Sequence, residues 1–217
     1  HQGNQRYVQG RLLAPNTDSV RRMLTASQGQ HPFAMVLACA DSRVPVETLF
    51  DRGVGDIFVT RVAGNVASTG VLGTLEYGAD HLGIPLLVVL GHTNCGAVTA
   101  VCKEEAAHGN LAELLQPITP AVQKAKRNAA VTNQACELGD VITENVRQAG
   151  ADLRAKGPDL ARLERDGALR IVGALYDINT GKVAWTLDDD EAEGPAGRYV
   201  PGTPLRSVPG CACPPVR

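Results

Sequence analysis

The chain has 217 residues, of which 44% are hydrophobic and 20% charged, a composition typical of a folded globular protein and not of a disordered one. Its 21 basic and 23 acidic side chains give a formal net charge of −2, and no basic cluster is long enough to suggest nucleic-acid binding. The longest apolar stretch, residues 84–90, is far shorter than the roughly 20 residues that span a bilayer. We therefore expect neither a nucleic acid nor a membrane as partner.

Short apolar runs that alternate with helical patterns predict an α/β fold. Residues 33–38 form a short continuous apolar run, as expected for a strand covered on both faces; residues 56–62 are a second predicted strand, and residues 85–90 a third, buried one. Residues 69–82 carry apolar side chains at helical spacing, and Gly83 closes that helix. This alternation is typical of a central, mainly parallel sheet flanked by helices.

The second half of the chain completes this arrangement. Helices are predicted at residues 95–107, 111–130 and 135–156. Two further strands, 169–176 and 182–187, flank an Asn-Thr-Gly turn, which predicts a hairpin. The sheet should therefore have an antiparallel edge.

One domain accounts for most of the chain. We expect it to cover residues 1–187, including an N-terminal helical arm, with an irregular tail over residues 188–217. Cys211 and Cys213 lie in that tail, and we assign them no function. The chain opens without a charged-then-apolar leader, which predicts a cytoplasmic protein. The helix-like pattern already present at residues 4–8 leaves an exported, periplasmic protein with a removed leader as the alternative.

Three side chains at strand ends form a ligand set for zinc. Cys39 follows the first predicted strand, and His92 and Cys95 follow the third, so a parallel sheet can bring them to one edge. Two thiolates and an imidazole suit zinc, and three protein ligands leave a fourth position open, as in catalytic sites. A buried cysteine and a core histidine would explain the same residues equally well.

A carboxylate and a guanidinium follow Cys39 closely. In an extended chain, the spacing of Asp41 and Arg43 places both side chains on one side. The guanidinium would keep the carboxylate ionised, and an ionised carboxylate can accept a hydrogen bond from a hydroxide and orient it. The alternative is a surface ion pair, worth at most about 1 kcal/mol.

These residues lie in two segments, CADSRV at 39–44 and GHTNCG at 91–96, which resemble the two signature segments of the β-class carbonic anhydrases. The resemblance extends from about residue 3 to residue 187. It implies an enzyme that reversibly hydrates carbon dioxide to bicarbonate and a proton, with one zinc ion per chain. It also implies the family's roles for five side chains: zinc binding by Cys39, His92 and Cys95, and orientation of the attacking hydroxide by Asp41 and Arg43.

Finer matches favour the plant-like branch of this family. Gln30, Phe58 and Tyr77 match its substrate-pocket residues, and Gly96 matches a residue whose backbone amide faces the substrate. In the family, part of this pocket comes from the neighbouring subunit. The resemblance therefore implies a homodimer, or a tetramer built from two dimers.

Two family features have no clear counterpart here. The regulated bacterial branch has a tryptophan where this chain has Val36, which argues against its bicarbonate-binding regulatory pocket although Arg61 is present. No residue identifies itself as the proton shuttle; His31, His81 and His108 are the candidates.

Three other interpretations compete with a carbonic anhydrase. A carbon disulfide or carbonyl sulfide hydrolase on the same scaffold would need the same zinc ion and ion pair. A noncatalytic binding module stabilised by zinc would lack hydration activity. A nucleotide-binding Rossmann-like domain is the weakest of the three, because no Gly-x-Gly-x-x-Gly follows the first strand.

Overall fold

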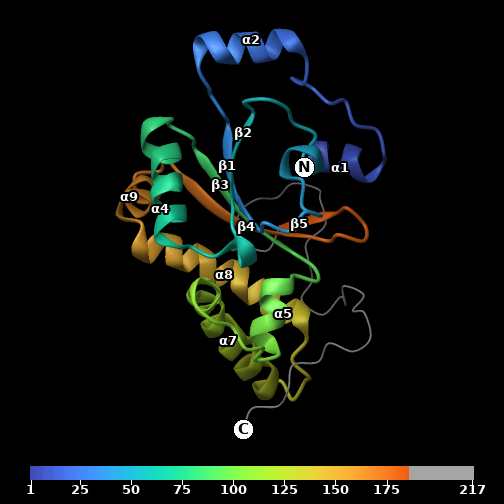
Figure 1. Cartoon of the computed structure of the whole chain (residues 1–217), viewed down its shortest axis with the longest axis vertical. Helices are drawn as coiled ribbons and strands as arrows, with labels where there is room; N and C mark the ends of the chain where they lie inside the picture. The colour runs from blue at the N-terminus through green and yellow to red at the C-terminus, as the bar shows by residue number, and fades with distance from the viewer. Residues whose placement is uncertain (186–217) are drawn as a thin grey trace.

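The computed structural model describes residues 1–185, so the predicted tail, with Cys211 and Cys213, lies outside the described residues. A five-stranded sheet with the order β2-β1-β3-β4-β5 forms the centre (Figure 1). The first four strands run parallel and β5 pairs antiparallel with β4, which confirms the predicted fold class and edge hairpin. The strands are β1 (Ala34–Ala38), β2 (Ile57–Arg61), β3 (Leu86–His92), β4 (Arg170–Tyr176) and β5 (Val183–Trp185).

The helices differ more from the prediction than the strands do. The predicted helix 69–82 is an α-helix that continues as a π-helical turn, the helix expected at 95–107 ends early, and the one expected at 111–130 is broken at Pro117. None of the helices within residues 1–185 is long and apolar enough to cross a bilayer. The helices are α1 (Gln2–Val8), α2 (Ser19–Gln28), α3 (Val46–Leu49), α4 (Thr69–Glu76), α5 (Gly96–Cys102), α6 (Asn110–Leu115), α7 (Thr119–Val131), α8 (Leu138–Lys156) and α9 (Pro158–Arg165), with the short turns η1 (Ala63–Asn65), η2 (Tyr77–His81) and η3 (Gln116–Ile118).

Both faces of the sheet are covered, which explains why β1 is a continuous apolar run. Met35 and Leu37 pack into the larger core, together with apolar residues of α4 and α8. Val36 and Ala38 point to the other face and pack into a second core with residues of α3 and with Tyr7 of α1. A strand buried on both faces needs apolar side chains at every position.

A glycine allows α8 to lie close against β3. A Cβ atom at Gly91 would lie 2.5 Å from Cγ2 of Val146 and 3.0 Å from Cδ2 of Leu175. Any larger residue at this position would push the helix or β4 away. The close packing therefore fixes the backbone immediately before His92.

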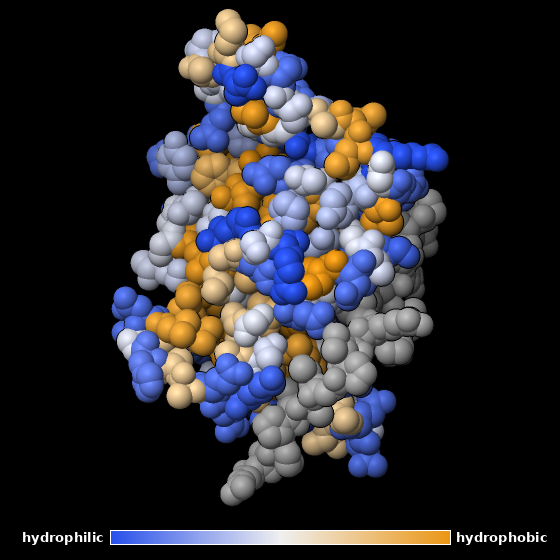
Figure 2. All heavy atoms as spheres, turned by 45° about the vertical axis from the view of Figure 1, so that its right-hand side comes forward, coloured by the Kyte–Doolittle hydropathy of each residue, from blue (hydrophilic) through white to orange (hydrophobic). Residues whose placement is uncertain are grey.

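The two N-terminal helices behave differently. Asn4 of α1 donates to the carbonyls of Leu49 (3.2 Å) and Gly181 (2.8 Å), so α1 packs on its own chain. No residue of α2 is buried, and the helix lies away from the sheet at the top of the molecule (Figure 1). Its exposed apolar side chains include Met23, which is 71% exposed, and apolar atoms are visible around this helix in Figure 2.

Candidate metal centre

The fold brings the three predicted metal ligands together. Cys39 follows β1, His92 is the last residue of β3, and Cys95 immediately precedes α5. Because β1 and β3 are parallel neighbours, their C-terminal ends meet. The ligand atoms of the three buried residues lie within 4.8 Å of one another, and the two Sγ atoms are 4.0 Å apart. Gly96 opens α5 beside this cluster and is exposed.

The imidazole of His92 is fully buried and presents a free nitrogen to the cluster. Its Nδ1 lies 2.9 Å from the carbonyl oxygen of Thr93. Because a carbonyl only accepts hydrogen bonds, Nδ1 carries the proton and Nε2 keeps a lone pair. Among the described residues, Nε2 has no hydrogen-bond partner. Burying such an atom is costly unless a cation binds it, so the residue fits a metal ion.

The two thiols fit a cation as well. A hydrogen bond with Cys95 holds the pKa of Cys39 at about 4, against the effect of burial. The same hydrogen bond, together with burial, raises the pKa of Cys95. The pair thus loses its first proton easily, and the second is retained because two adjacent thiolates repel each other. A divalent cation would remove that repulsion, and this donor set suits zinc.

Asp41 and Arg43 form a two-point ion pair beside the cluster. Arg43 Nε and Nη2 donate to the two carboxylate oxygens of Asp41 at 2.9 and 2.7 Å. The predicted extended geometry is wrong: the chain turns here, and the backbone N–H of Arg43 also donates to Asp41. The guanidinium holds the pKa of Asp41 well below its usual range. An ionised oxygen, Oδ2 of Asp41, therefore lies 3.9 Å from Nε2 of His92.

Arg61 fixes the backbone of this segment, a role that the sequence analysis missed. From the end of β2, its Nε donates to the carbonyl oxygen of Cys39 at 3.0 Å, and its Nη2 donates to that of Asp41. Arg43 in turn donates to the carbonyl oxygen of Asn94 at 3.2 Å, which joins the two signature segments. The only signal in the sequence was a charged residue at the end of an apolar strand.

The predicted pocket residues lie at the other end of the sheet. Phe58 pairs with Met35, which lies four residues before Cys39, so the two positions are about 13 Å apart along the strand direction. The ring of Tyr77 lies beside that of Phe58, with centroids 6.3 Å apart, and Gln30 is exposed in the segment before β1. Within one chain, these three residues do not line the metal-binding cluster.

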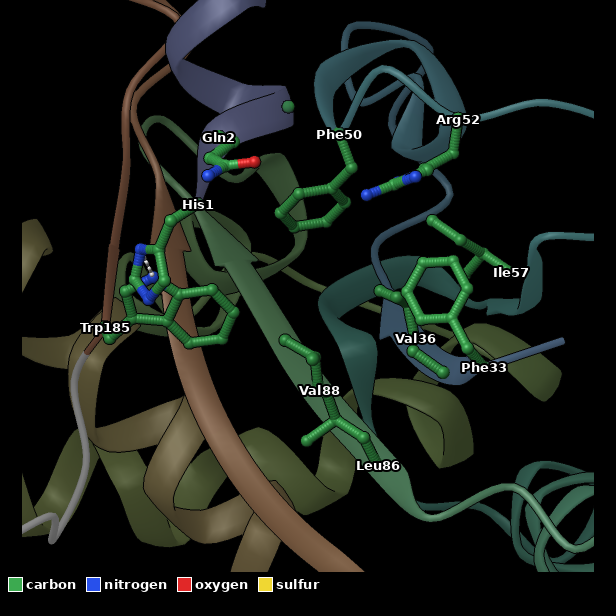
Figure 3. Close-up of a pocket in the computed structure, with 12 residues that line it drawn as sticks. His1, Gln2, Phe33, Val36, Phe50, Arg52, Ile57, Leu86, Val88 and Trp185 are labelled. Atoms are coloured by element: carbon green, nitrogen blue, oxygen red, sulfur yellow. Dashed lines mark hydrogen bonds between the residues drawn. The ribbon is translucent and has the colours of Figure 1, made fainter. Parts of the chain in front are cut away.

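A cavity of about 280 Å³ lies on the sheet face that carries Val36 and Val88, opposite the face that packs into the larger core. Figure 3 shows apolar side chains such as Val36 and Val88 at its floor, with Arg52 and Trp185 at its sides. Among the described residues that line it, none is a predicted site residue. The cavity therefore adds no residue to the predicted site.

The fold and the cluster define a metal-binding α/β protein with an ionised carboxylate beside its metal ligands. The family model of carbonic anhydrases matches residues 34–183. The carbonic anhydrase of Mycolicibacterium smegmatis is 36% identical over 185 residues, which cover 83% of this chain and 87% of that protein.

Solved structures agree with this relationship. The β-carbonic anhydrase CafA of Aspergillus fumigatus has a TM-score of 0.66 at 27% identity and covers 79% of this chain and 82% of its own. A chain from the crystal structures of two tetrameric β-carbonic anhydrases of Sordaria macrospora shares the fold, with a TM-score of 0.64 at 24% identity, over 77% of this chain and 86% of that chain. The chain belongs to the β-class carbonic anhydrases, and its Cys-His-Cys cluster is typical of their zinc site.

Proposed function

We propose that this chain hydrates carbon dioxide at the cluster of Cys39, His92 and Cys95, with Asp41 and Arg43 as the catalytic pair. One observation carries the proposal: the buried Nε2 of His92, which has no hydrogen-bond partner within residues 1–185, lies near both thiols and 3.9 Å from the carboxylate of Asp41. A zinc ion held by the three ligands would supply Lewis-acid activation of a water molecule.

The ion pair sets the direction of attack. An ionised carboxylate only accepts hydrogen bonds, so Asp41 accepts one from the attacking hydroxyl group and turns its lone pair toward the carbon atom of the substrate. Two hydrogen bonds from Arg43 keep the carboxylate ionised and fix its plane. Arg61 holds the backbone on which both Asp41 and Cys39 are mounted.

Zinc analysis combined with stopped-flow hydration of carbon dioxide tests these roles. Cys39→Ser should lose both zinc and activity, whereas Cys136→Ser, outside the cluster, should keep both. Asp41→Asn should keep about one zinc per chain but lose about a hundredfold or more in rate, because an amide also donates hydrogen bonds. Full zinc occupancy in Cys39→Ser, or a nearly normal rate in Asp41→Asn, would contradict the assignments.

Parallel assays with carbonyl sulfide and carbon disulfide test the hydrolase alternative.

We further propose that a second copy of the chain completes each pocket with its Gln30, Phe58 and Tyr77, as in the plant-like branch. The register supports this, because Phe58 lies about 13 Å from Cys39 of the same chain along the strand direction. The backbone amide of Gly96, beside the last ligand, is the part of the pocket that the same chain would contribute.

An unpartnered helix face supports a shared site. Val20, Met23 and Leu24 are exposed on α2 at helical spacing, and Leu13, in the segment before it, is 71% exposed. An amphipathic helix gains stability only when its apolar side is covered. Because α1 packs on its own chain, we assign the dimer contact to residues 11–28 and not to the first ten residues. We also propose that two dimers pair into a tetramer. The Sordaria macrospora enzymes are described as tetrameric.

We also propose a cytoplasmic location. The Sγ atoms of Cys39 and Cys95 are only 4.0 Å apart, and an oxidising compartment would favour a disulfide between them. Such a disulfide would remove two of the three proposed ligands. Fractionation of cells that express the full-length protein tests this location, and recovery in an oxidising compartment would contradict it.

A further inference from the structure

The turn η1 (Ala63–Asn65) lies against the first proposed zinc ligand. The backbone N–H of Gly64 donates to Sγ of Cys39 at 3.3 Å. Gly64 has φ of +72° and Asn65 has φ of +45°, so two consecutive residues adopt the left-handed conformation. Asparagine adopts this conformation more readily than most residues that carry a side chain, but at a higher cost than glycine, so contacts around the turn help to hold it.

Neighbouring side chains restrict this turn from one side. A Cβ atom at Gly64 would lie 2.7 Å from Cδ1 of Ile118 and 3.3 Å from Cβ of Ala97. The turn is therefore packed against η3 and α5, and no side chain fits at its centre. Packing limits the space that the turn can occupy, but it does not by itself set the direction in which the peptide groups point.

A side chain from α8 supplies that direction. Asn145 is 2% exposed, and its Nδ2 donates to the carbonyl oxygen of Gly64 at 2.8 Å. That carbonyl belongs to the peptide group between the two left-handed residues, Gly64 and Asn65. Because the bond is buried, water does not compete with it strongly, and it holds this peptide plane in one orientation.

We propose that Asn145 is a positioning residue of the metal centre: by holding the 64–65 peptide it fixes the conformation of Gly64, and through Gly64 the adjoining 63–64 peptide, whose N–H is directed at Sγ of Cys39. The proposal rests on the proposed function, because it assigns Cys39 as a zinc ligand. An N–H donor directed at a thiolate stabilises its negative charge and orients its lone pairs, and such supporting contacts tune how firmly a metal is held.

Substitutions at Asn145 separate this role from simple packing. Asn145→Leu keeps a similar volume and removes the donor. Asn145→Asp keeps the shape of the side chain and replaces the amide donor with a carboxylate, which accepts hydrogen bonds. If the leucine variant does not fold, the aspartate variant tests whether the donor of Asn145 is needed. Thr143→Val is the matched control, because it removes a partly buried hydrogen bond of the same helix, from Oγ1 of Thr143 to the carbonyl of Gly139, that does not reach the turn.

Two readouts report on the metal centre without an activity assay. Competition with a chromophoric chelator gives the zinc affinity, and cobalt(II) substitution gives the sulfur-to-cobalt charge-transfer band. In the Asn145 variants we expect affinity to fall about tenfold or more and the band to shift, with both unchanged in Thr143→Val.

The outcomes separate this proposal from the zinc assignment itself. A wild-type protein that binds no zinc at this site would refute the zinc assignment. A wild-type protein that binds zinc, with folded Asn145 variants of equal affinity and an identical cobalt spectrum, would overturn only the role of Asn145.

Discussion

His81, one of the three candidate proton shuttles, lies against Tyr77. Its imidazole stacks on the ring of Tyr77, with centroids 5.3 Å apart and planes 29° apart. Tyr77 is one of the proposed pocket residues. Because His81 contacts a proposed pocket residue, we propose it as the proton shuttle among the three histidines that the sequence offered.

A shuttle residue predicts a specific kinetic defect. His81→Ala should lower kcat about tenfold in dilute buffer, because the proton then leaves slowly, and added imidazole should restore it. The ratio kcat/KM should stay unchanged, because it reports the attack on carbon dioxide and not the proton release. His108→Ala serves as the control. Stopped-flow assays over a range of buffer concentrations measure both parameters, and an unchanged kcat in dilute buffer would exclude the role.

At the scale of elements, one carboxylate ties the N-terminal segment to the body of the protein. Asp51, two residues after α3, is buried and pairs with Arg6 of α1. It also accepts hydrogen bonds from the backbone N–H groups of Leu13 (3.1 Å) and Ala14 (2.9 Å). Burial alone would raise the pKa of Asp51, but these donors outweigh it and the pKa lies below its usual value.

A lowered pKa in the folded state makes stability depend on pH in a defined direction. The contribution of Asp51 is fully present above its unfolded pKa of about 3.9 and is lost as the pH falls below that value. Asp51→Asn should therefore be less stable by about 1–3 kcal/mol at pH 7, and the difference from wild type should shrink toward pH 3. Urea unfolding across this range measures it, with the exposed Asp159→Asn as control. A difference that stays constant with pH would show that the charge of Asp51 is not the cause.

At the scale of the whole molecule, the proposed dimer contact on the apolar face of α2 would connect assembly with activity. Introducing charge there, with Met23→Glu and Leu24→Glu together, should convert the dimer into monomers at micromolar concentration. Activity should fall in parallel, because each pocket would lose the residues that the partner contributes. Arg22→Glu introduces the same residue on the other side of the helix and should leave the dimer intact.

Sedimentation velocity and the hydration assay, run on the same samples, separate the outcomes of this experiment. A fully active monomer would overturn the shared pocket, and it would leave the assignment of the metal ligands untouched. A dimer that persists in the double variant would move the subunit contact away from α2.

Local patterns in the sequence determined the strands and the hairpin and, together with the family resemblance, indicated the metal ligands. A run such as residues 34–38 identifies a buried strand because each side chain meets a covered face, and the Asn-Thr-Gly turn identifies the hairpin through its backbone preferences. The ligands could be found because chemistry in parallel sheets gathers where strands end. The start of α9 also had a local signal, Pro158 directly after Gly157, which the sequence analysis did not use.

Only the tertiary structure decided how those ligands are supported. The hydrogen bond from Asn145 to Gly64 joins residues 81 positions apart, and the hydrogen bonds of Arg61 join the end of β2 to the segment that follows β1. Such contacts leave no periodic pattern, because each depends on two segments that become neighbours only when the chain folds. The distance between Phe58 and Cys39 could not be predicted from the sequence either. The register of neighbouring strands is set by packing against the helices and not by either strand alone.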